Sequence, residues 1–152
     1  AETGTWVNLT IYVGLARIHA LESQLQESGL DGTELALLDQ LKRVHDAGMK
    51  GSNQLVQAGA KIAPGSDAGW RSYPLGHFQK ELAALTELDI SAMQAIVAGT
   101  KESAKSIGVG NSVGTLESGK QADVLVTAGN PLENLDALSS VEAVFKDGMQ
   151  VK

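Results

Sequence analysis

Apolar residues in the first half of the chain fall into two patterns, continuous runs and helical spacing. The segments Trp6–Val13 and Ala60–Pro64 are almost continuously apolar, which is typical of strands covered on both faces. Between them, helical spacing extends from Asp31 as far as Gln57. The order strand, helix, strand is the repeating unit of α/β folds, so this half is predicted to be α/β material.

The predicted helix before the second strand has a clear start. Asp31 can accept hydrogen bonds from the first free amides, and Glu34 can reach back, which forms a capping box. We expect a weak point at Gly48 or Gly51, because glycine lowers helix stability. The residues at helical spacing expected in the core are Leu35, Leu38, Leu41 and Val44.

Two shorter helices are predicted after the loop 68–76. One follows His77, and the other begins at Ser91, which forms a capping box with Gln94. A break is expected at Gly99. The residues expected to face the core are Phe78, Leu82 and Leu85 in the first helix, and Met93, Ile96 and Val97 in the second.

The pattern changes after Gly108, where short strands and turns replace helical spacing. Val124–Val126 is predicted to be a strand. Val141–Lys146 should pair with Met149–Val151 across Asp147-Gly148, a frequent two-residue hairpin connection. The last forty or so residues therefore resemble a small β appendage.

Composition narrows the function classes. The chain of 152 residues has a formal net charge of −6 and no cluster of basic residues, which argues against nucleic acid or an anionic membrane surface as a partner. It has no cysteine, so disulfides, thiolate metal sites and a cysteine nucleophile are excluded. No signal-peptide pattern or membrane span is predicted, and a cytoplasmic location is favoured while the compartment stays open.

The stretch KIAPGSDAGW places Asp67 where an apolar strand ends. Active sites are built at the carboxyl ends of parallel strands, and turns also often contain aspartate, so the spacing alone leaves both interpretations open. In a turn, the Asp67 side chain would cap its own loop.

Three stretches together resemble a known family: Gly65–Gly69 (GSDAG), Ser91–Thr100, and Gly114–Val126 (GTLESGKQADVLV). In order and spacing they are similar to the carboxyl-terminal portion of metal-dependent amidohydrolases, in the imidazolonepropionase-like and Xaa-Pro-dipeptidase-like branch. The third stretch is the most specific. Mild departures are Ser66 for threonine, Ala92 for proline and Gly99 for alanine.

This resemblance implies the last strands and helices of a (β/α)₈ TIM-like barrel over residues 1–110, followed by a β-sandwich segment over 111–152. A complete barrel needs about 250 residues, and the family's His-x-His pair and middle-strand ligands do not occur in this sequence. The chain is thus expected to be inactive alone and to require the remaining barrel portion, from the same gene or another chain.

By similarity, Asp67 is the acid at the end of the last barrel strand. The resemblance implies that it is both a ligand of a divalent metal, expected to be zinc, and the general base toward a metal-activated water. Arg71, Tyr73 and His77 in the following loop are candidate substrate contacts, each with a structural alternative. The other histidines, His19 and His45, are predicted to be structural.

The leading hypothesis is a hydrolase of C–N bonds in amides, cyclic amides or dipeptides. One rival is a non-catalytic α/β interaction or assembly module that retains the amidohydrolase scaffold. Another is a self-contained doubly wound domain. Because unpaired strand edges are normally covered, the chain is expected to associate or oligomerise.

Overall fold

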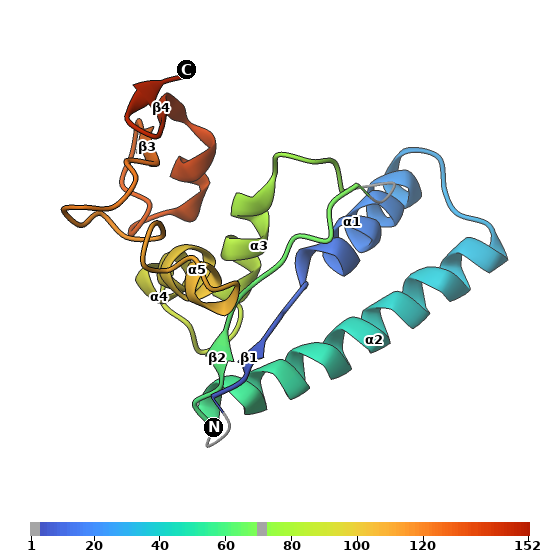
Figure 1. Cartoon of the computed structure of the whole chain (residues 1–152). Coiled ribbons are helices and arrows are strands. Elements are labelled where there is room, and N and C mark those ends of the chain that lie inside the picture. Colours follow the sequence, from blue (N-terminus) through green and yellow to red (C-terminus); the bar gives the residue numbers. More distant parts are fainter. Residues whose placement is uncertain (1–3, 70–72) are drawn as a thin grey trace.

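The computed structural model describes residues 4–69 and 73–152. Its first part joins two short parallel strands to a set of helices, and its last part is a small antiparallel sheet (Figure 1). The elements are β1 Trp6–Val7, α1 Tyr12–Glu27, α2 Gly32–Gln57, β2 Lys61–Ile62, α3 Phe78–Leu85, α4 Ala92–Val97, η1 Ala98–Glu102, α5 Ser103–Ser106, β3 Val124–Thr127, η2 Leu135–Ser139, β4 Val141–Lys146 and β5 Met149–Gln150.

The strands β1 and β2 lie side by side in parallel (Figure 1). Backbone hydrogen bonds continue the pairing beyond their ends, since Gly65 N–H donates to the Leu9 carbonyl at 2.9 Å. The predicted strand over Trp6–Val13 is too long, because β1 ends at Val7 and α1 begins at Tyr12. The order strand, helices, strand, helix agrees with the α/β class predicted from the sequence.

The long helix α2 confirms the predicted start and length. The Asp31 side chain accepts from the amides of Thr33 and Glu34, and the Glu34 side chain accepts from the Asp31 amide. The helix passes through its internal glycines without a break and ends at Gln57. Its predicted apolar face is wrong in part, since only Leu38 is buried, against α1, while Val44 is 64% exposed.

The predicted capping box at Ser91 is confirmed, but the predicted break at Gly99 is wrong. The backbone widens into the π-helix η1 and continues into α5. A Cβ at Gly99 would lie 2.6 Å from Leu82 Cδ2 of α3, so glycine here permits close helix packing. The prediction that Met93 faces inward is also wrong: it is half-exposed, and the small Ala95 and Ala98 are buried instead.

The main core lies between the two parallel strands and helices α3 and α4. Apolar side chains from the strand ends pack on α3, which places that helix directly beside the loops that follow the strands. The buried members of this cluster are Leu9, Ile11, Ile62, Leu82, Ala84, Leu85, Leu88, Ala95, Ala98 and Leu135.

The β3–β5 sheet confirms the predicted hairpin. β4 and β5 pair antiparallel around Asp147 and Gly148, which both have positive φ, as a type I′ turn requires. The side chain of Asp123, which belongs to the Gly114–Val126 stretch, accepts a hydrogen bond from the Asp147 amide at 2.8 Å. This residue therefore anchors the hairpin turn.

Two other residues of the Gly114–Val126 stretch, Gly114 and Lys120, also make structural contacts. Gly114 has φ +91°, and a Cβ there would lie 2.7 Å from Ala104 Cβ. The ammonium of Lys120 is largely buried and donates to the Gly110 carbonyl and the Thr115 hydroxyl. The close approach at Gly114 brings this loop against α5, and the Lys120 hydrogen bonds hold the loop together.

Candidate active site

Asp67 follows β2 at the carboxyl end of the parallel pair, in the loop Gly65–Gly69. Its backbone is in the left-handed region, with φ +46°, a conformation that is uncommon for residues other than glycine and that occurs often at functional sites. The residue is exposed, and its carboxylate accepts no hydrogen bond and forms no ion pair within the described residues. The side chain thus does not cap its own loop.

The loop is held by other groups. At its base, the Asn8 side chain donates to the Ala63 carbonyl at 3.0 Å and lies directly against Gly65, where a Cβ would be 2.9 Å from Asn8 Oδ1. The Ala68 amide donates to the Ser66 hydroxyl at 3.3 Å. These contacts fix the backbone on both sides of Asp67, and none of them uses its carboxylate.

The far end of the loop is fixed by Tyr73. Gly69 N–H donates to the Tyr73 carbonyl at 2.8 Å, and the Tyr73 hydroxyl donates to the His77 carbonyl at 3.0 Å. The Tyr73 ring is 1% exposed and meets the Tyr12 ring edge-on, with centroids 4.9 Å apart. Burial raises the pKa of Tyr73 to about 12, with a further contribution from the nearby Glu81 carboxylate.

The structure gives different information about the three candidate substrate contacts, Arg71, Tyr73 and His77. Tyr73 has the structural contacts given above. His77 is partly exposed and immediately precedes α3, with no side-chain capping bond. Arg71 lies outside the described residues. Substrate contact by each of them stays a prediction.

Glu81 is the residue of this region that the sequence analysis missed. It lies on α3, is 0% exposed, and accepts from the amides of Ile11 and Tyr12 at 2.6 and 2.7 Å. Burial raises the pKa of Glu81 to about 7, although the two backbone hydrogen bonds act to lower it. Its position three residues after Phe78 and four before Leu85 puts an acid on an apolar helix face, a signal that the sequence already contained.

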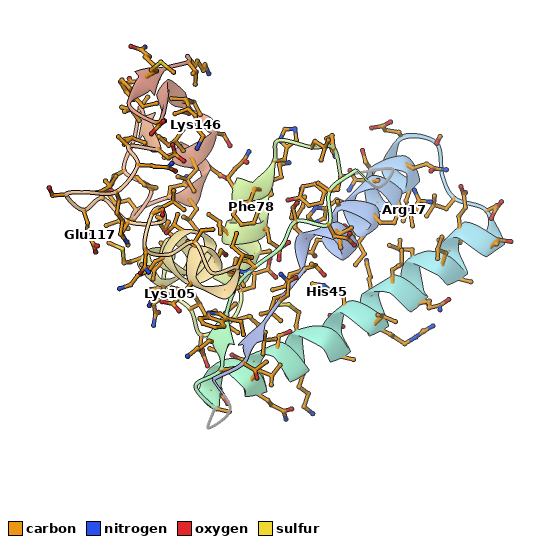
Figure 2. All side chains as sticks on the ribbon, in the orientation of Figure 1. Arg17, His45, Phe78, Lys105, Glu117 and Lys146 are labelled. Carbon is orange, nitrogen blue, oxygen red and sulfur yellow. The ribbon has the colours of Figure 1, made fainter. Side chains whose placement is uncertain are left out.

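Within residues 4–69 and 73–152, no three His, Asp or Glu side chains gather closely enough to hold a metal ion. Figure 2 shows His45 on α2, remote from Lys146 and Glu117 at the other end of the molecule. A cavity of about 240 Å³ between α1 and α3 is lined by Tyr12, His19 and Lys80 among others. Its lining does not include Asp67.

Comparison with known proteins decides the family. The model of the amidohydrolase family matches residues 1–151, almost the whole chain. The chain belongs to the amidohydrolase family. This confirms the resemblance drawn from the three sequence stretches, and the α/β content of the structure, together with its similarity to solved amidohydrolases, fits a fragment of a TIM-barrel superfamily fold.

Individual amidohydrolases are also similar to this chain in sequence and structure. The imidazolonepropionase of Thermoanaerobacter pseudethanolicus is 28% identical over 109 residues, which are 68% of this chain and 26% of that protein. The structure resembles a Xaa-Pro dipeptidase with bound methionine in its active site, with a TM-score of 0.75, 27% identity and coverage of 99% of this chain and 35% of that one. It also resembles a prolidase-like protein from Bifidobacterium longum, with a TM-score of 0.72, 32% identity and coverage of 84% and 31%.

The chain thus spans about a quarter to a third of the length of these relatives. In the part of the chain that the structure describes, no helix is long and apolar enough to cross a membrane.

Proposed function

We propose that this chain supplies the carboxyl-terminal part of a hydrolase that cleaves C–N bonds in small amides, cyclic amides or dipeptides. Asp67 is its reactive carboxylate. Residues 1–110 would be the last strands and helices of the barrel and residues 111–152 a β-sandwich segment. Family membership and the hydrolases among the similar proteins support this proposal.

The observation that carries the proposal is the state of the Asp67 carboxylate. It stands at the carboxyl end of a parallel strand, on strained backbone, with no partner of its own among the described residues. An exposed carboxylate held by a firm loop is suited to accept a proton from an attacking water and return it to the leaving nitrogen.

The described residues supply one candidate ligand of a metal centre, the Asp67 carboxylate. The Asp67 carboxylate has no partner within residues 4–69 and 73–152, while a catalytic zinc requires about three protein ligands, and no such group of ligands occurs in those residues. The remaining ligands would come from barrel strands outside these residues. A bound divalent ion, which the family suggests to be zinc, would supply an activated water and polarise the scissile carbonyl.

Hydrolysis assays on the assembled barrel test this proposal. This chain would be expressed with the polypeptide that supplies the missing strands and assayed on Xaa-Pro dipeptides, acyl-amino acids and an imidazolone acid. Because proton transfer contributes roughly 10²–10⁴-fold to rate, and Asp67 is also proposed to hold the metal, Asp67→Asn should lower kcat/KM by at least that factor.

The matched control is Asp46→Asn, which removes an exposed carboxylate of α2 and should leave kcat/KM unchanged. Undiminished activity in Asp67→Asn would contradict the role given to that residue. An assembled barrel that cleaves none of these substrates would favour the alternative of a non-catalytic assembly module.

A further inference from the structure

We infer that Glu81 is a positioning residue for the Asp67 loop and acts through Tyr12 and Tyr73. The inference rests on the proposed function only in the sense that Asp67 is the group being positioned. The contacts themselves are features of the fold.

The first link joins the start of α1 to α3. Helix α1 has no capping side chain of its own, since Ile11 precedes it without a side-chain hydrogen bond. The Glu81 carboxylate replaces that cap from α3, with one oxygen on the Ile11 amide and the other on the Tyr12 amide. A carboxylate at a helix N-terminus satisfies free amides and faces the positive end of the helix dipole.

The second link passes through packed rings. With its amide held by Glu81, Tyr12 presents its ring edge-on to Tyr73 at 4.9 Å. Tyr73 is fully buried, and such a side chain has little freedom to change its rotamer in a close-packed interior. The position of α1 therefore constrains Tyr73.

The third link reaches the loop. The Tyr73 carbonyl accepts from Gly69 N–H at 2.8 Å, and Gly69 is two residues after Asp67 in the sequence. No bond from Glu81 to the loop is needed, because each contact in this series fixes the next. The first link is strong because, without the Glu81 carboxylate, the buried Ile11 amide and the part-buried Tyr12 amide would lose their acceptors at a desolvation cost.

Amide hydrogen exchange on this chain tests the series of contacts. Glu81→Ala removes both acceptors, and Glu81→Gln keeps the size and one acceptor oxygen. The control Leu38→Ala removes a buried side chain of α2 that packs with Ile18 and Leu21 of α1. It lowers global stability and loosens the α1 packing, but it removes none of the hydrogen bonds or ring contacts that link Glu81 to Gly69.

The measured quantity is the exchange rate of the Gly69 amide. We expect it to rise roughly tenfold more in Glu81→Ala than in Leu38→Ala, with Glu81→Gln between them, because local opening is reported by exchange at the affected amide. Equal Gly69 exchange in Glu81→Ala, Glu81→Gln and Leu38→Ala would overturn the inference. This readout needs neither metal nor activity, so its failure is distinguishable from failure of the proposed hydrolase function.

Discussion

The buried carboxylate of Glu81 makes a specific prediction about stability and pH. Its pKa is about 7 in the folded chain against an ordinary value of 4.5. Between these pH values the folded state holds the proton while the unfolded state has released it. The Glu81 contribution to stability is therefore complete below about pH 4.5 and is lost as the pH rises through about 7.

The magnitude follows from the size of the shift. At about 1.4 kcal/mol for each pKa unit, the Glu81 contribution to the free energy of unfolding should fall by about 3 kcal/mol over this range. Glu81→Gln has no proton to release and should lack this contribution. The predicted quantity is the difference in unfolding free energy between wild type and variant, which should decrease by about 3 kcal/mol from pH 4.5 to pH 8.

Urea unfolding followed by circular dichroism at several pH values gives this difference directly. Among the described residues, three other carboxyls have lowered pKa values and favour stability at higher pH. They are Glu22 beside Lys42, Glu102 beside Lys105 and Asp123 beside Lys146. These groups are the same in both proteins, so they cancel in the difference. Parallel pH profiles for wild type and Glu81→Gln would show that Glu81 titrates normally and is not buried as described.

Three further substitutions test the fold. Gly114→Ala should destabilise the chain by roughly 1–3 kcal/mol, because the added Cβ meets Ala104 from a left-handed backbone; an unchanged melting temperature would contradict the close approach. Lys120→Met should lower the free energy of unfolding in urea by about 1–2 kcal/mol, since it removes two part-buried hydrogen bonds of a charged donor, and a variant as stable as wild type would contradict the stabilising role of these bonds. Asp31→Ala should cost about 1 kcal/mol through loss of the α2 cap, visible as reduced helicity on heating, whereas identical melting would show that Glu34 and solvent suffice.

Features set by neighbouring residues were predictable from the sequence. The capping boxes at Asp31 and Ser91 and the Asp147-Gly148 hairpin all depend on residues within three positions of one another. Local hydrogen-bonding chemistry decides such features whatever surrounds them.

Features set by distant contacts were not predictable in this way. The strand at Trp6 was predicted too long because Glu81, seventy residues away from Ile11, caps the helix that replaces its end. The inward face of α4 was misassigned because close packing on α3 favours the small Ala95 over Met93. Apolarity ranks residues by their preference for burial, but the distance between helices selects those that fit.

The features of the candidate site also differ in whether the sequence alone predicts them. Asp67 was identifiable from the sequence, because a strand end and a family motif coincide there. The left-handed backbone of Asp67, and the lack of a carboxylate partner among residues 4–69 and 73–152, required the structure. The role of Glu81 also required it, since a lone acid on an apolar helix face has no assigned partner until the fold provides one.

Zinc binding by the assembled barrel tests the role of Asp67 most directly. The chain and its Asp67→Asn and Asp46→Asn variants would each be purified with the polypeptide that supplies the missing strands, and their zinc content measured after dialysis against metal-free buffer. We expect bound zinc in wild type and Asp46→Asn and its loss in Asp67→Asn. Equal zinc content in all three proteins, or none in any of them, would contradict the assignment of Asp67 as a metal ligand.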